Sequence, residues 1–450
     1  MNTSSGSTSF PSIDATSVTR TAQLTITNKG SWNQITVNLD TSTPGGETTF
    51  NEMATDRVTT FDLIAMTNYS NSGANAITVN NVRVNYTQTG EQSAFPTDGG
   101  DGGQIVTVTS LADSGTGTLR AALAMNVPRT IGFAVSGEIM LNSQLVVSNP
   151  CVTVDGLSAP SPGIGVKGDR VWVSPASHDV ALKHLRVRVG ELVTSPHSSA
   201  DTHDGISINT SNVLVENCSV SWSVDELMEV WGTNLSNIVI RNNIFAEALK
   251  TSVHPKGDHS MGVLIGPSSR NVIVQGNLFA HNVHRNPVVH ANAQALVVNN
   301  LIYQPGFEGF HIYTDPDYPG ATLVSVVGNK VIGWPSGTTW YRTRYPLCAD
   351  GYNPGTQIYY QDNLVEGTTI AFDPTETFGT PPQAVPVVST PPIPISVTPL
   401  ASSAVEASVL TNAGARPADR DATDTRIISE VMTRTGQIRD NPTDPSITVP

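Results

Sequence analysis

One short pattern returns along the middle of the chain and restricts the possible folds more than any other feature. Each copy alternates apolar and polar residues for about five positions and ends in a polar turn, which is the periodicity of a β-strand. Similar strands separated by loops of uneven length are typical of a solenoid, whose rungs pack only on their neighbours. The copies are NVLVENC (212–218), NIVIRNN (237–243), NVIVQGN (271–277), QALVVNN (294–300), LVSVVGN (323–329) and QIYYQDN (357–363).

These repeats predict a right-handed parallel β-helix, because no single copy can bury its apolar side chains without the rungs above and below it. An Asn ends five of the six copies. Asn tolerates left-handed backbone angles at a bend, and stacked amides can hydrogen-bond along a column. The alternative is an ordinary β-sandwich with Asn-rich turns.

The composition fits an all-β, turn-rich protein. Charged residues make up 14% of the chain, whereas there are 37 Gly and 30 Pro. The net charge of −14 argues against nucleic acid and anionic membrane surfaces as partners. A polyanionic substrate remains compatible with this charge, because a bound cation or a local basic cleft reverses the sign where the substrate binds.

The chain has three cysteines, which cannot form a disulfide framework and are expected to be buried thiols. No run of 18 apolar residues predicts a membrane span. The first residues, MNTSSGSTSF, lack the charged and apolar parts of a signal peptide. Few cysteines and a polar surface nevertheless suit a secreted protein, which we expect to be a monomer.

The N-terminal part is expected to contain a separate module. Residues 1–17 are Ser/Thr-rich and predicted to be a disordered leader. The alternating text of 18–92 predicts a small β-sandwich, which vaguely resembles a carbohydrate-binding module. A spacer or assembly domain is the alternative. A Gly/Asp linker covers 93–103.

The β-helix is predicted over residues 104–377. A strand, a turn and a short helix in 105–124 are the expected cap on its open end. The segment 378–450 is expected to pack on the solenoid as a Pro-rich strap followed by two helices, at roughly 401–413 and 424–435.

Two acidic pairs flank the first repeat. Asp201 and Asp204 precede it, and Asp225 and Glu229 follow it. In a β-helix these positions lie on neighbouring rungs, so the four carboxylates can converge. Oxygen ligands of this kind suit Ca²⁺. The alternative is that they are solvated surface acids.

A basic group follows on the next rungs. In a chain with only 24 Lys plus Arg and 10 His, this concentration of cationic side chains is unusual. Cations beside carboxylates suggest an anionic ligand bridged by a metal. The histidines match no closed zinc pattern. The group consists of His254, Lys256, His259, His284, Arg285 and His290.

Several pieces of the chain, in order, resemble the pectate lyases of the parallel β-helix class, especially a bacterial branch. The resemblance covers about three quarters of the chain, from 104 to 442, and leaves out the N-terminal module. The pieces are GTGTLRAAL (115–123), VDGLSAPSPGIGVKGD (154–169), VENCSVSWSVDE (215–226), HPKGDHSMGVLIG (254–266), NLFAHNVHRNPVV (277–289) and RPADRDATDTRIISEV (416–431).

The resemblance implies roles for individual residues. Arg285 matches the family's Brønsted base, and Lys256 lies near the lysine that grips the substrate carboxylate. His254, His259, His284 and His290 are then expected to contact the substrate. The family's calcium ligands would be Asp201, Asp204, Asp225 and Glu229.

The chain also departs from the family pattern. Relatives often read R-x-P-R-x-R where this chain has Arg285, Asn286, Pro287, Val288, Val289 and His290, so substrate contacts there must differ. Glu216 stands where many members have Asp, which makes it a candidate additional ligand.

The implied reaction is calcium-assisted β-elimination on a 1,4-linked galacturonan, the anionic polysaccharide partner. Arg285 is an awkward base because guanidinium normally stays protonated. It either takes the C5 proton itself or stabilises charge while hydroxide, His254 or His290 takes that proton. Two other classes remain open: a polygalacturonase-like hydrolase, whose adjacent Asp pair is missing here, and a non-catalytic polysaccharide-binding or tail protein.

Overall fold

The chain, described by a computed structural model, divides into two compact units, residues 1–94 and 95–450. Side chains are described for residues 97–190, 203–312, 315–333, 348, 352–366 and 386–439. The backbone alone is described for the N-terminal strands and for residues 313, 345–347, 349 and 350.

The N-terminal unit contains two antiparallel sheets. Four strands pair in the order β1-β2-β3-β4, and β5 pairs with β6. Two antiparallel sheets fit the all-β module expected for 18–92, and β1 adds a strand within the segment 1–17. The strands are β1 (Thr8–Pro11), β2 (Thr21–Lys29), β3 (Trp32–Leu39), β4 (Glu47–Met53), β5 (Val58–Asn68) and β6 (Thr78–Gln88).

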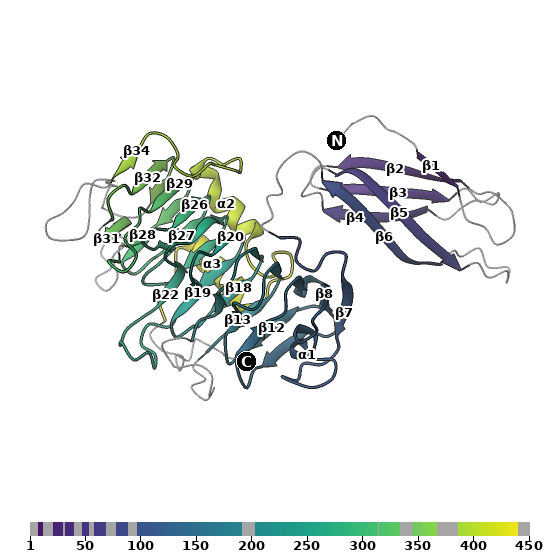
Figure 1. Cartoon of the computed structure of the whole chain (residues 1–450), viewed down its shortest axis with the longest axis horizontal. Coiled ribbons are helices and arrows are strands. Elements are labelled where there is room, and N and C mark those ends of the chain that lie inside the picture. Colours follow the sequence, from purple (N-terminus) through teal and green to yellow (C-terminus); the bar gives the residue numbers. More distant parts are fainter. Residues whose placement is uncertain are drawn as a thin grey trace. The chain divides into compact units, whose positions relative to one another are not determined.

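The second unit confirms the predicted parallel β-helix. Its strands form three sheets in which each strand pairs in parallel with the strand one rung away, and Figure 1 shows the rungs stacked along the solenoid. One continuous core of buried Val, Ile and Leu runs through the rungs. Each fully buried side chain of this kind stabilises the fold by roughly 1.5–3 kcal/mol. An isolated rung cannot gain this stabilisation, because the burial depends on the neighbouring rungs.

The repeats form the eleven-stranded sheet. The run 180–190 is divided between two strands by a left-handed residue, His184 with φ of 55°. The strands are β7 (Gln104–Val108), β8 (Arg129–Phe133), β11 (Val152–Asp155), β14 (Val180–Lys183), β17 (Val213–Glu216), β20 (Ser236–Arg241), β23 (Arg270–Gln275), β26 (Gln294–Val298), β29 (Leu323–Val327), β32 (Gln357–Gln361) and β34 (Val387–Val388).

The short strands that follow the repeats form the nine-stranded sheet. They are β9 (Gly137–Met140), β12 (Ile164–Lys167), β15 (Arg186–Arg188), β18 (Ser219–Ser221), β21 (Ile244–Ala246), β24 (Leu278–Ala280), β27 (Leu301–Tyr303), β30 (Lys330–Ile332) and β33 (Leu364–Glu366).

The eight-stranded sheet carries most of the polar residues singled out in the sequence. Its strands are β10 (Leu145–Val147), β13 (Val171–Val173), β16 (Ile206–Ile208), β19 (Glu226–Val230), β22 (Met261–Ile265), β25 (Val288–Val289), β28 (Glu308–Tyr313) and β31 (Tyr345–Asp350).

The Asn residues that end the repeats form a hydrogen-bonded column inside the solenoid. The side-chain oxygen of Asn277 accepts from both the main-chain N–H and the amide of Asn243 at 2.9 Å, and the same arrangement continues to Asn300. The expected left-handed angle, however, belongs to the preceding residue, such as Asn242 with φ of 55°. The column Asn therefore supplies hydrogen bonds, and its neighbour makes the bend.

Helices lie near both ends of the second unit's sequence. At the N-terminal end, β7 is followed by α1 (Leu119–Leu123). Near the C-terminus, α2 (Ser402–Asn412) and α3 (Ala422–Thr433) lie close to the predicted helices. Both helices pack their apolar residues on β21, β24 and β27 of the nine-stranded sheet. Among the described residues, no helix has the length and hydropathy needed to cross a membrane.

Candidate active site

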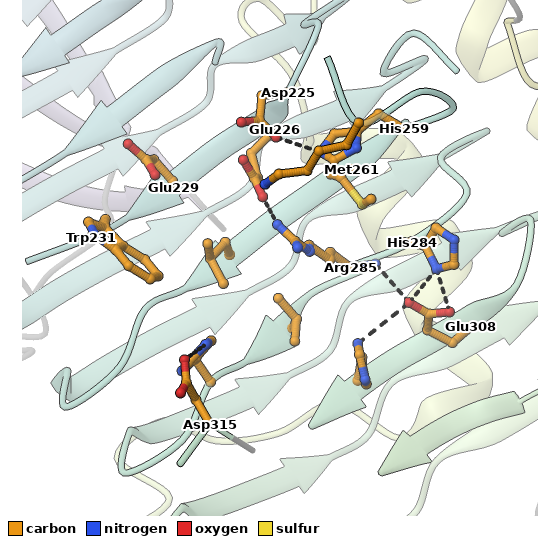
Figure 2. Close-up of a pocket in the computed structure, with 15 residues that line it drawn as sticks. Asp225, Glu226, Glu229, Trp231, His259, Met261, His284, Arg285, Glu308 and Asp315 are labelled. Atoms are coloured by element: carbon orange, nitrogen blue, oxygen red, sulfur yellow. Dashed lines mark hydrogen bonds and ion pairs between the residues drawn. The ribbon is translucent and has the colours of Figure 1, made fainter. Parts of the chain in front are cut away.

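A cavity of about 530 Å³ lies over the eight-stranded sheet, where β19, β22, β25 and β28 stack (Figure 2). At roughly 4.8 Å per rung, four strands span about 14 Å, which suits a stretch of polymer better than one small molecule. The cavity is lined by Asp225, Glu226, Glu229, Trp231, Lys256, His259, Met261, Leu264, His284, Arg285, Val288, His290, Glu308, His311 and Asp315.

The parallel register places these side chains in rows across the rungs. The row toward the strand ends consists of Glu229, Leu264, Val288 and His311, each paired with the next. The row at the strand starts consists of Glu226, Met261 and His284. Residues far apart in the sequence thus become neighbours, because each rung adds one member to each row.

Three carboxylates form an acidic cluster, defined here as Asp204, Glu226 and Glu229. Their oxygens lie within 4.8 Å of one another. Asp204 is 1% exposed, and its Oδ2 accepts a hydrogen bond from the Ser207 hydroxyl at 2.7 Å. The Arg170 guanidinium lies 3.4 Å from the same oxygen. The cluster is therefore largely shielded from water and offers oxygen ligands only.

Crowding and burial change the protonation of this cluster. Burial, followed by the charge of Asp225, raises the pKa of Asp204 to about 6. Burial, followed by the charge of Asp204, raises the pKa of Glu229 to about 9. Carboxylates this close repel one another strongly in a low-dielectric site. Without a bound metal ion, the acidic cluster therefore retains a proton on Glu229 at neutral pH.

Asp225 is bound by two stacked histidines. The rings of His254 and His259 lie 3.6 Å apart at 12°. His259 Nε2 lies 2.7 Å from Asp225 Oδ1, and His254 Nε2 lies 3.7 Å from Oδ2. The Lys256 N–H donates to His254 Nδ1 at 3.2 Å, so the neutral ring carries its proton on Nε2.

Arg285 joins the acidic cluster through an ion pair between its guanidinium and Glu226 (Figure 2). Its neighbour His284 is held by Glu308, which is 1% exposed and lies 2.8 Å from His284 Nδ1. Glu308 also accepts from the Arg285 main-chain N–H at 3.4 Å and lies 3.5 Å from His311 Nδ1. This buried carboxylate therefore orients the segment that carries His284 and Arg285.

Comparison with known proteins agrees with this geometry. A family profile described as "Right handed beta helix region" matches residues 192–341. The probable pectate lyase C of Neosartorya fischeri is 31% identical over 337 residues, which cover 74% of this chain and 74% of that protein. The chain belongs to the pectate lyase family.

Further relatives of this pectate lyase family member support the same assignment. The probable pectate lyase C of Aspergillus terreus is 34% identical over 60% of this chain and 59% of that protein. The crystal structure of jun a 1, the major allergen from cedar pollen, has a TM-score of 0.53 at 20% identity and covers 71% of this chain and 90% of that chain, which supports the fold. These proteins are fungal and plant, so the expected bacterial branch is not supported.

Most residues expected for a pectate lyase site lie in one cavity. Asp204 belongs to the acidic cluster. His254 is only 4% exposed and contacts Asp225 instead of lining the cavity, which disagrees with its expected role as a substrate contact. Asp201 lies outside the described residues. The expected residues that line the cavity are Asp225, Glu229, Lys256, His259, His284, Arg285 and His290.

Sequence reasoning misses eight of the cavity residues, among them Glu226, Trp231 and Glu308. Glu226 directly follows Asp225, and strand alternation would have assigned only one of two neighbours to the site. Glu308 stands alone in the apolar run GFEGFH (306–311), a context in which a buried charge needs a partner.

The additional ligand suggested at Glu216 is wrong. Its side chain lies on β17 of the eleven-stranded sheet and pairs with Arg241 at 2.6 Å and with Lys183 at 3.5 Å. Because these cations neutralise it on another face of the solenoid, Glu216 cannot contribute to the acidic cluster.

Proposed function

We propose that this protein is a secreted, calcium-dependent pectate lyase that acts as a monomer and cleaves 1,4-linked polygalacturonate by β-elimination. The observation that carries the proposal is the acidic cluster, whose Glu226 and Glu229 line one cavity with Lys256 and Arg285, on the scaffold of the pectate lyase family. Oxygen ligands beside cationic side chains suit an anionic polymer held partly through a metal. In a chain of net charge −14, such local cations are needed to attract a polyanion.

The residues of the acidic cluster fit Ca²⁺. They offer only carboxylate oxygens, which hard cations prefer, and Asp225 adds a further carboxylate at the cavity wall. The raised pKa values of Asp204 and Glu229 point the same way, because their charged forms need a cation. When bound, Ca²⁺ would supply the positive charge that acidifies the proton next to the substrate carboxylate.

Elimination removes the proton on C5 of a galacturonosyl unit and breaks its C4–O bond. Lys256 is positioned to neutralise the substrate carboxylate. Arg285, whose charged form is stabilised by Glu226, is positioned to balance the negative charge that develops in the transition state. His284 is a better base than Arg285 for the C5 proton, because Glu308 fixes its Nδ1 and leaves Nε2 to accept a proton in the cavity.

The N-terminal unit is proposed as an accessory carbohydrate-binding module. Its two antiparallel sheets offer a compact scaffold for such a role. The full-length chain should then bind insoluble pectic material through the N-terminal unit even when Arg285 is replaced, which a pull-down with such material would measure.

The deciding experiment follows the ultraviolet absorbance of polygalacturonate incubated with the protein, with calcium and separately with a chelator. A rise in the unsaturated-uronide band that disappears with the chelator supports elimination and the metal together. New reducing ends without that band would point to hydrolysis instead. Binding of the polymer without either product would leave a polysaccharide-binding protein on this scaffold.

A further inference from the structure

The two sides of the cavity differ in chemical character. The side at the strand starts carries Lys256, His284 and Arg285, as described above. The side at the strand ends begins with Leu264 and Val288, which are paired in register on neighbouring rungs and are both buried. Glu229 occupies the same row but belongs to the acidic cluster. Between the acidic cluster and His311, the floor of the cavity is therefore apolar.

Trp231 forms the wall of this apolar side. It directly follows β19 and is 38% exposed, although a large aromatic side chain gains from being covered. The His290 ring contacts it edge-on at 5.8 Å and 85°. Gly266 lies against the indole, since a Cβ at this glycine would come within 3.2 Å of Trp231 Cε3. The indole is thus held in place with one part open to the cavity, as a platform for a sugar ring.

The charges on this side disfavour an anion. Burial lowers the pKa of His290 to about 4, although Asp315 opposes the shift, and Arg285 and His311 reinforce it. His290 is therefore uncharged at neutral pH. The other ionisable side chain here is Asp315, whose Oδ2 lies 3.6 Å from His290 Nε2. A galacturonate carboxylate placed against Trp231 would meet the Asp315 carboxylate, and Arg285, the cation that acts on His290, is already paired with Glu226.

We propose that the side of the cavity formed by Trp231, Leu264, Val288, His290 and Asp315 binds a methyl-esterified galacturonosyl unit, next to the ionised unit that reacts beside Arg285. This inference rests on the proposed lyase function and specifies its substrate as partly esterified homogalacturonan. The ester removes the charge that Asp315 repels and adds a methyl group for the apolar floor. The ring can then stack on the indole through its C–H groups.

The test compares kcat/KM for product formation on homogalacturonan of two kinds, fully de-esterified and about half esterified, under the same calcium concentration. Because this polymer contains no neutral sugars, a difference in kcat/KM between the two substrates can be attributed to the methyl ester. The variants are Asp315→Asn and Trp231→Ala. The matched control is Asp317→Asn, which makes the same change of charge on an exposed residue two positions away that does not line the cavity. Asn at 315 can still accept the Asp317 N–H at 2.9 Å, which should preserve the loop.

The wild-type protein should prefer the half-esterified polymer. Asp315→Asn should lower that preference about fivefold, mainly by improving turnover of the de-esterified chain. Trp231→Ala should reduce kcat/KM on the half-esterified chain about tenfold and affect the other substrate less. Asp317→Asn should leave the preference unchanged.

Preference for the de-esterified chain, together with an unchanged ratio in both cavity variants, would overturn this inference while leaving the lyase function intact. An absence of unsaturated product from either polymer would overturn the proposed function and this inference with it. If Trp231→Ala fails to fold, the comparison of Asp315→Asn with Asp317→Asn decides alone.

Discussion

Replacing Glu229 with Gln should remove most of the pH dependence of stability in the metal-free protein. Burial and the neighbouring Asp204 raise the pKa of Glu229 from 4.5 to about 9. The folded protein therefore holds a proton that the unfolded chain releases above about pH 4.5. Because the native state binds more protons in this window, the free energy of unfolding falls as the pH rises from about 4.5 to about 9.

The size of the effect follows from the pKa shift. At 1.36 kcal/mol per pKa unit, the upper bound is about 6 kcal/mol. Glu229 is partly exposed and shares its proton with Asp204, so we expect about half of this, about 3 kcal/mol. About 2 kcal/mol of this falls between pH 6 and pH 9, and at an unfolding entropy of about 2.1 cal/mol/K per residue it lowers the Tm of a protein of this size by about 2–3 °C.

Thermal unfolding followed by circular dichroism, after treatment with a chelator, measures this fall directly. Glu229→Gln should flatten the dependence, whereas Glu366→Gln, at a half-exposed carboxylate on β33 whose lowered pKa keeps it ionised from pH 6 to pH 9, should keep the wild-type slope. Added calcium should raise the Tm of the wild type most at pH 9, where the cluster is ionised. Equal slopes for wild type and Glu229→Gln would refute the assignment of the raised pKa to this carboxyl group.

Three further predictions test other parts of the structure. Arg285→Ala should reduce kcat/KM for elimination by about a hundredfold or more, because the charge that balances the transition state is lost, as steady-state kinetics would show. Glu308→Gln should lower kcat about tenfold with little change in KM, and it should shift the pH dependence of kcat, because His284 loses the carboxylate that fixes it. If the wild-type rate keeps rising beyond pH 10, the base is Arg285 instead. Asn277→Ala should destabilise the fold by about 2–3 kcal/mol in urea unfolding, because it leaves buried main-chain groups without partners. Asn271→Gly removes an exposed Asn–Asn hydrogen bond at a residue with a left-handed backbone angle, which Gly tolerates, and should cost less than about 0.5 kcal/mol.

The solenoid was predictable because its cause is local and repeated. Each rung shows the same alternation, and the Asn at its end makes the same hydrogen bonds from Asn243 to Asn329. What the repeat could not show is which residue bends. The side-chain hydrogen bonds of each column Asn restrain its backbone. The left-handed angle is therefore adopted by the preceding residue, which is Asn242, Gly276 or Asn299.

The site was predictable only in part, because register and facing decide it. The sequence places Asp225 and Glu229 four apart, which suggests a shared site. In the structure, Asp225 is bound by His259, and Glu226 takes the place beside Glu229. Whether Asp225 or Glu226 lies beside Glu229 depends on where β19 begins and on a histidine from the next rung. Neither can be inferred from the spacing of residues in the sequence.

The C-terminal tail shows the same limit over a longer range, because its contacts reach the loop that carries Lys256. The Arg439 carbonyl accepts from the Lys250 N–H at 2.8 Å, and the Lys250 carbonyl accepts from the His259 N–H at 2.8 Å. The Arg439 side chain donates to Glu247 at 3.0 Å. Arg426 and Arg439, followed by other contacts, lower the pKa of the buried Glu247 to about 2 in spite of its desolvation. Breaking one partner of such a buried ion pair typically costs about 3–5 kcal/mol, so the tail is fixed firmly beside the loop. The sequence predicts only that this segment packs on the solenoid. In the structure it also helps to position the loop that carries Lys256, through partners nearly two hundred residues away in the sequence.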